Sequence, residues 1–325
     1  MNALQEWFWP DFVPATVLVT DWGGPLGWIF AMQLTFYLLG VRQGVFIGLV
    51  AVLSLLLNSW LKSLLFLPRP YMLDPTVQVH QPTPGLGMPS GHAQGAAALW
   101  YGIANFGRSL ICWRLLALFV IALVCLSRVI LGVHSVAQVV IGAALGFSVL
   151  GLCLRVREPL LAWLRARGSP TAIAAVFVAL LAALFVTMAI DGLRADQLVP
   201  ALWQENFAHA SRGIAGASEL SLHSLLASAA AYALVMAALG LALIGFLQKH
   251  RPVRLDRWTQ RLLCVFVGCL VTALFWWFAG ASDWTNSPLA LLLPLLYPLV
   301  CGYLPVALTD RLCRWRGRHA QEIAH

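Results

Sequence analysis

Long apolar runs alternate with short polar segments along the whole chain. A bilayer core takes about 20 apolar residues of α-helix to cross, and most of these runs approach or exceed that length with few charges inside them. The pattern predicts nine membrane-spanning helices, near residues 24–41, 44–66, 91–107, 111–130, 134–154, 170–190, 222–247, 262–281 and 286–308. We therefore expect an all-α protein, a polytopic bundle of membrane helices.

The composition favours the same class of protein. Hydrophobic residues make up 60% of the chain and charged residues 10%, whereas about a quarter of the residues in a soluble domain are charged. The seven cysteines are an odd number, lie mostly in or beside apolar runs and show no metal-ligand spacing. They are best interpreted as small apolar residues, and no metal or cofactor is predicted.

Most basic residues fall in alternate loops of the nine-helix pattern. They are Arg42; Arg108 and Arg114; Arg155, Arg157, Arg165 and Arg167; Lys249, Arg251, Arg254, Arg257 and Arg261; and Arg311, Arg314, Arg316 and Arg318. Basic loops face the cytoplasm in membrane proteins, so the N-terminus is expected outside and the C-terminus in the cytoplasm. The net charge of +8 thus indicates topology, and nucleic-acid binding is not expected. Lys62, Arg69 and Arg128 lie on the opposite side and need another explanation.

The segment Met88-Pro89-Ser90-Gly91-His92 stands between a proline-rich loop and an apolar run. Small polar residues at the start of a helix leave backbone N–H groups unpaired, and such a terminus favours an anion. A histidine in the first turn can exchange protons near neutral pH. Taken alone, the segment fits an ordinary helix cap equally well.

Further polar groups come from separate segments on the same predicted side. Lys62 lies near the end of the second apolar run, and Arg69 follows between two prolines. Arg128 ends the fourth run and His134 begins the fifth. Each cation alone could be an interfacial anchor. Three cations and two histidines at one level instead favour phosphoryl transfer, which needs cationic donors around the phosphate oxygens, a nucleophile, and an acid for the leaving oxygen.

These residues resemble the three-part signature of the type 2 phosphatidate phosphatase superfamily, relatives of the vanadium haloperoxidases. The matching parts are Lys62 with Arg69-Pro70, then Pro89-Ser90-Gly91-His92, then Ser127-Arg128 with His134. The resemblance implies a metal-independent phosphatase with a phosphohistidine intermediate. It implies that His134 is the nucleophile and His92 the general acid and base. The phosphate-binding set implied is Lys62, Arg69, Ser90, Gly91 and Arg128.

Gln138 departs from the usual pattern, because most members have an aspartate four residues after the nucleophile. A glutamine carbonyl could still orient the His134 ring but supplies no full charge. Glucose-6-phosphatase looks similar at this position and in its nine-span layout with an outside N-terminus. We expect Gln138 to orient His134.

The signature predicts a phosphatase core at residues 1–155 and additional membrane helices with a basic cytoplasmic tail at 156–325. An outside loop, 191–221, carries Leu198, Leu202, Trp203 and Phe207 at helical spacing. This stripe could form a lid over the site, but a plain connector is the favoured interpretation. The roles of the last four spans, and any protein partners, stay open.

The sequence thus predicts hydrolysis of a membrane lipid phosphate at the bilayer surface, in a bacterial inner membrane, with the site facing the periplasm. Phosphatidate, phosphatidylglycerol phosphate or an isoprenoid diphosphate such as undecaprenyl diphosphate would fit. The enzymatic alternatives are hydrolysis of a sugar phosphate and phosphoryl transfer to an acceptor other than water. Outside enzymology, the chain could be a transporter that binds phosphate lipids, or an inactive scaffold.

Overall fold

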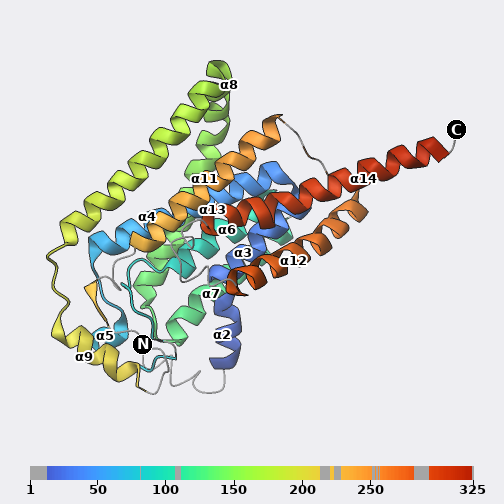
Figure 1. Cartoon of the computed structure of the whole chain (residues 1–325). Coiled ribbons are helices and arrows are strands. Elements are labelled where there is room, and N and C mark those ends of the chain that lie inside the picture. Colours follow the sequence, from blue (N-terminus) through green and yellow to red (C-terminus); the bar gives the residue numbers. More distant parts are fainter. Residues whose placement is uncertain are drawn as a thin grey trace. The chain divides into compact units, whose positions relative to one another are not determined.

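A computed structural model describes residues 13–80, 82–106, 111–212, 220–222, 228–250, 253, 255, 257–281 and 293–323. Within these ranges every regular element is helical, which confirms the predicted all-α membrane protein. The chain forms two compact units (Figure 1). Unit 1 comprises Met1–Trp28 and Leu53–Tyr232, and unit 2 comprises Ile29–Val52 and Ala233–His325.

Five helical stretches in the described ranges are long and apolar enough to cross a bilayer. They are Val41–Leu73, Ile111–Ile130, Val136–Arg194, Ala231–Lys249 and Leu293–Trp315. Two shorter apolar helices cover Phe30–Leu39 and Trp258–Leu274. The nine-span count, the orientation and the division at residue 155 stay predictions. Arg108, Arg251 and Arg254, the starts of the spans predicted at 222–247 and 286–308, and part of the 191–221 loop lie outside the described residues.

Helix α8 (Val136–Arg194) covers two of the predicted spans in one 59-residue element. It is not one straight rod, because Gly168 has non-helical backbone angles, with φ 81° and ψ 178°. This left-handed region suits glycine, which has no Cβ. Pro170 follows two residues later and cannot continue a helical hydrogen-bond ladder. Figure 1 shows the two arms of α8 meeting at a sharp bend.

The centre of unit 1 is α6 (Gly91–Phe106), packed against α7 (Ile111–Ile130) and the first arm of α8. The stretch Ala93–Leu99 of α6 is buried throughout. Small residues on α8 let the two backbones approach closely. A Cβ atom added at Gly142 would lie 2.5 Å from the carbonyl oxygen of Ser90. This close contact brings the start of α8 against the start of α6.

A second group of packed residues in unit 1 lies around α5 (Pro70–Leu73) and α9 (Ala201–Ala210), which are neighbours in Figure 1. Trp203 and Phe207 of α9 are buried in one cluster with Tyr71 and Met72 of α5. Val133, next to His134, belongs to the same cluster. The remaining elements of unit 1 are α2 (Val13–Asp21) and the second half of α4 (Val41–Leu65).

Unit 2 is a separate helical core. Its elements are most of α3 (Pro25–Leu34), η1 (Thr35–Leu39), the first half of α4, α11 (Ser228–His250), α12 (Trp258–Ala281), α13 (Leu293–Tyr297), η4 (Pro298–Tyr303) and α14 (Leu304–Ile323). Phe36, Leu241 and Ile244 are among its most buried residues. All seven cysteines are free thiols, and Cys264 and Cys301 are buried in this unit.

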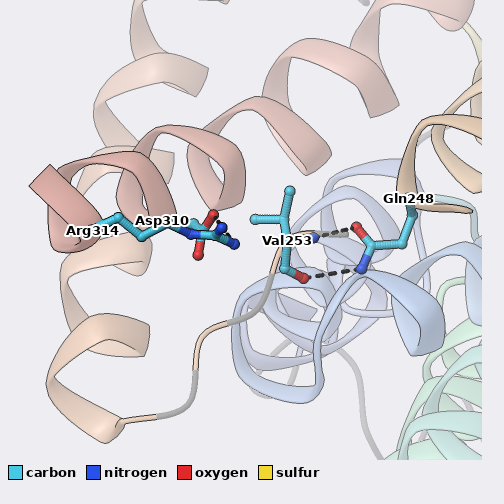
Figure 2. Close-up of polar contacts among 4 residues, drawn as sticks. All are labelled: Gln248, Val253, Asp310 and Arg314. Atoms are coloured by element: carbon cyan, nitrogen blue, oxygen red, sulfur yellow. Dashed lines mark hydrogen bonds and ion pairs between the residues drawn. The ribbon is translucent and has the colours of Figure 1, made fainter. Parts of the chain in front are cut away.

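Figure 2 shows polar contacts of unit 2, between α11 and the segment that follows it and within α14. The Gln248 side chain donates to the carbonyl oxygen of Val253 and accepts from its backbone N–H, both at 3.0 Å. On α14, Arg314 forms an ion pair of 2.9 Å with Asp310. Because Arg314 is largely exposed, this pair contributes little to stability.

Candidate active site

Arg69 is the most extensively bonded of the three predicted phosphate-binding cations. It follows the end of α4, stands between Pro68 and Pro70, and has only 6% of its surface exposed. Its Nε donates to the carbonyl oxygen of Gly85 at 2.9 Å, and its Nη1 donates to that of Val133 at 3.2 Å. The same Nη1 lies 3.4 Å from Nε2 of His134. Arg69 therefore joins the end of α4 to the loop that carries the predicted nucleophile.

Ser90 and Gly91 form the N-terminal end of α6, as the sequence predicts. The backbone N–H of Ser90 donates to the carbonyl oxygen of Gln138 at 3.0 Å. Ser90 is fully buried, and its Oγ has no hydrogen-bond partner among the described residues. A buried hydroxyl normally finds a partner. The arrangement therefore leaves one hydroxyl available to a bound oxyanion at a helix N-terminus.

A buried polar network supports the turn before α6, and the sequence did not assign it a role. Asn58 of α4 donates from Nδ2 to the carbonyl oxygen of Pro89 at 3.2 Å and to Oε1 of Gln94 at 2.8 Å. Gln94 donates in turn from Nε2 to the carbonyl oxygen of Ser54 at 2.6 Å. In the sequence, each of these amides lies one helical turn from a predicted site residue. That spacing is the signal by which the network could have been found. The network fixes the Pro89-Ser90 turn against α4.

His134 is 1% exposed and lies just before α8. Ser135 is the N-cap of that helix, and its Oγ accepts from the backbone N–H of Gln138 at 3.3 Å. Gln138 completes a capping box, because its Oε1 accepts from the backbone N–H of Ser135 at 3.2 Å. The same Oε1 lies 3.1 Å from Nδ1 of His134.

The other end of the Gln138 amide determines which atom faces the imidazole. Its Nε2 donates to the carbonyl oxygen of Pro68 at 2.9 Å, so Oε1 must point toward His134. An oxygen there accepts a hydrogen bond from the N–H of Nδ1, which leaves Nε2 of His134 with its lone pair. Gly87 packs on this contact, since a Cβ atom there would lie 2.5 Å from both Gln138 Nε2 and the Pro68 oxygen.

Lys62, Arg128 and His92 complete the group in unit 1. The charges of Lys62, Arg69 and Arg128 act on the imidazoles of both His92 and His134. Arg128 is 8% exposed, and its Nη1 donates to Oγ1 of Thr20 at 2.6 Å. All predicted site residues therefore lie in unit 1, where Lys62, Gly91 and His92 are half-buried and the others are buried.

Two residues near this region were not predicted from the sequence. Thr20 of α2 holds Arg128 by the hydrogen bond above. The ring centroid of Trp28 lies 6.4 Å from that of His92. The Trp28 ring also packs against Gly95, one turn further along α6. Neither residue belongs to a motif or shows a distinctive spacing, so the sequence offered no signal for them.

The proline-rich loop at 71–88 is tied to itself by local bonds. Tyr71 donates from its hydroxyl to the carbonyl oxygen of Thr83 at 2.8 Å. The Asp74 carboxylate accepts hydrogen bonds from Oγ1 and the backbone N–H of Thr76, which lower the pKa of that carboxyl group. Asp74 and His80 are exposed. Their exposure favours solvated loop residues over catalytic ones.

The segment of the chain that carries this helical, cation-rich site is similar to a family of membrane phosphatases. Residues 43–162 match the sequence profile of the PAP2 superfamily, and this segment contains every predicted site residue. The part of the chain that carries the predicted site is therefore similar to the PAP2 superfamily, a family of phosphoric ester hydrolases. No curated protein matches the chain.

One solved structure is similar to part of the chain. It is the crystal structure of the first transmembrane PAP2 type phosphatidylglycerolphosphate phosphatase from Bacillus subtilis. The two sequences are 27% identical over 48% of this chain and 84% of that one, with a TM-score of 0.41.

Proposed function

We propose that the protein hydrolyses a lipid phosphate or an isoprenoid diphosphate without a metal ion, through a phosphohistidine at His134. The observation that carries this proposal is the bonding of the His134 ring. Gln138 Oε1 lies 3.1 Å from Nδ1, and Nε2 faces the Arg69 guanidinium. A buried imidazole held in this tautomer has a directed lone pair beside a cation that can bind the phosphoryl group.

The reaction has two steps. In the first, the lone pair of His134 Nε2 forms a bond to phosphorus, and the bond from phosphorus to the leaving oxygen breaks. The leaving oxygen takes that electron pair and accepts a proton from His92. In the second, His92 removes a proton from water, whose oxygen attacks phosphorus and displaces Nε2. The products are the alcohol, or the lipid monophosphate, and inorganic phosphate.

The cations stabilise the charge that develops on the phosphoryl oxygens. Arg69 and Arg128 present planar guanidinium groups suited to two oxygens each, and Lys62 acts as a point charge. Ser90 Oγ and the N–H groups at the start of α6 add neutral donors. Because Arg69 and Arg128 are buried and held by hydrogen bonds, little reorganisation of these two groups is needed as the transition state forms.

Gln138 fulfils the orienting role without a negative charge. Its carbonyl oxygen selects the tautomer of His134, as an aspartate would, but it stabilises a cationic imidazole less strongly. The electrostatic contribution to the first step must therefore come mainly from the interaction of the cations with the phosphoryl oxygens.

The surroundings of Lys62 and Arg69 support a lipid substrate. Leu64, Leu65, Leu67 and Leu73 are each more than 40% exposed and lie close in sequence to Lys62 and Arg69. Apolar side chains beside a phosphate site suit acyl or isoprenoid tails that remain in the bilayer. The distribution of basic loops supports a site on the extracytoplasmic face and a cytoplasmic C-terminus.

A panel assay tests the proposal. The full-length protein in detergent is given phosphatidate, phosphatidylglycerol phosphate, undecaprenyl diphosphate and glucose 6-phosphate, each with EDTA. Phosphate release from one or more lipids, inhibited by orthovanadate and lost in His134→Ala, is the expected result. Preference for glucose 6-phosphate would support the sugar-phosphate alternative. Vanadate binding without any turnover would support the transporter.

A further inference from the structure

Arg194, at the end of α8, lies against the C-terminal end of α4. The last carbonyl groups of a helix have no partner within the helix. Arg194 supplies two of them with donors: its Nε donates to the carbonyl oxygen of Ser63 at 3.0 Å, and its Nη2 donates to that of Leu64. A planar guanidinium can bond both carbonyls at once, which an ammonium group does less well. Arg194 therefore fixes the helix end that carries Lys62.

The same guanidinium holds the turn that leads to Arg69. Phe66 has a left-handed backbone with φ 48°, a conformation that is rare for a bulky residue and persists only when its surroundings impose it. The Arg194 guanidinium carbon lies 5.4 Å from the centroid of the Phe66 ring. The Trp203 ring of α9 is stacked on Phe66, with centroids 5.6 Å apart.

Helix α9 also holds the residues just after Arg69. Asn206 is buried and donates from Nδ2 to the carbonyl oxygen of Met72 at 3.0 Å. The Phe207 ring lies 6.4 Å from the ring of Tyr71. Both contacts fall on α5, the short helix for which Arg69 is the N-cap residue.

We infer that Arg194, Trp203 and Asn206 form a brace that sets the relative positions of Lys62 and Arg69, and so the affinity of the site for a phosphoryl group. All three lie beyond residues 43–162, the segment that matches the family. They are positioning residues and touch no substrate. The inference rests on the proposed function, and it gives the 191–210 region a role other than lid or plain connector.

The first test replaces Arg194 in the full-length protein. Arg194→Gln removes both carbonyl contacts and the stacking on Phe66, whereas Arg194→Lys keeps the charge. Arg212→Gln, an exposed arginine of the same region, is the matched control. The readouts are the inhibition constant of orthovanadate, KM and kcat for the preferred lipid, and the melting temperature. Small displacements in a site can cost up to about 100-fold in rate. We expect a rise of about tenfold in the vanadate constant for Arg194→Gln, a smaller rise for Arg194→Lys, and none for Arg212→Gln.

A second variant tests the brace if Arg194→Gln does not fold. Asn206→Leu removes the hydrogen bond to Met72 and keeps a side chain of similar size, and Leu202→Ala on the exposed side of α9 is its control. Weaker vanadate binding in Asn206→Leu alone supports the brace. Vanadate and KM values equal to those of the wild type in folded variants would overturn it, even if the melting temperature fell. A wild type that neither binds vanadate nor releases phosphate would overturn the proposed function, and the brace with it.

Discussion

Gln138 and His134 are joined by a hydrogen bond whose direction is fixed from outside the pair. The Gln138 Nε2 donates to the Pro68 carbonyl at 2.9 Å, so Oε1 faces Nδ1 of His134 at 3.1 Å. The Pro68 carbonyl belongs to the segment that carries Arg69. The proposed nucleophile, the amide proposed to orient it and the Arg69 cation are therefore held by one set of contacts.

Replacing Gln138 should impair catalysis more than folding. Gln138→Leu removes the group that selects the His134 tautomer, and we expect kcat to fall on the order of 100-fold. Gln138→Glu keeps the acceptor but sets a second oxygen against the Pro68 carbonyl, so a fall of about tenfold is expected. Steady-state kinetics in detergent measure both, with Val140→Ala, on the exposed face of α8, as control. Full activity in Gln138→Leu would refute the orienting role. The presence of glutamine at this position would then give no information on whether the chain is an enzyme or an inactive scaffold.

His92 should matter in proportion to the leaving group. An alkoxide leaving from a lipid phosphate needs a proton, whereas a phenolate of low basicity leaves without one. We expect His92→Asn to reduce kcat for a lipid monophosphate by about 100-fold or more. It should reduce the first step with p-nitrophenyl phosphate far less, as pre-steady-state release of p-nitrophenol would show. Equal losses with both substrates would assign His92 a role other than general acid.

Gly87 offers a steric test of the same contact. A Cβ atom at this position would meet both Gln138 Nε2 and the Pro68 oxygen at 2.5 Å, closer than real carbon atoms approach. Gly87→Ala should therefore separate the two groups and lower kcat by about tenfold or more. Gly151→Ala is the matched control, since an added Cβ meets nothing within 4 Å there. If the two variants were equally active, the close packing described for Gly87 would be wrong.

The Asn58 network should contribute mainly to stability. Asn58→Leu leaves the Gln94 Oε1 and the Pro89 carbonyl without their donor, and buried groups left unsatisfied cost about 1–3 kcal/mol each. A lower melting temperature in detergent is expected, together with weaker vanadate binding because the Ser90 turn loses its support. Leu53→Ala, at an exposed position of the same helix, controls for truncation. An unchanged melting temperature in Asn58→Leu would show that the network is dispensable.

The candidate site was largely predictable because its residues violate a strong rule. Lys62, Arg69 and Arg128 are cations on the predicted side that carries few others, and their spacing to His92 and His134 matches a motif. The all-α membrane class followed from the length of the apolar runs. Both signals are local in sequence and need no knowledge of packing.

What the sequence could not supply depends on contacts between distant segments. In the sequence, Arg194 is a basic residue in a predicted outside loop. The structure shows that it bonds Ser63 and Leu64 at the end of α4. Thr20 lies 108 positions from Arg128, its bonding partner. Hydropathy also could not decide how many apolar runs are full spans, because α6, with 16 residues, is short yet deeply buried. Its burial comes from close packing of small residues, which run length does not report.

The most direct test of the phosphohistidine is chemical trapping. The full-length His92→Asn protein, in which hydrolysis of the intermediate should be slow, is mixed with ³²P-labelled p-nitrophenyl phosphate, whose leaving group needs no proton, and quenched in alkali. We predict label on the protein that is stable to alkali, labile to acid, and located by peptide mapping at His134. It should be absent from a His134→Ala, His92→Asn double variant. Turnover by the wild type with no protein-bound label in any variant, or label that persists without His134, would contradict the proposed mechanism.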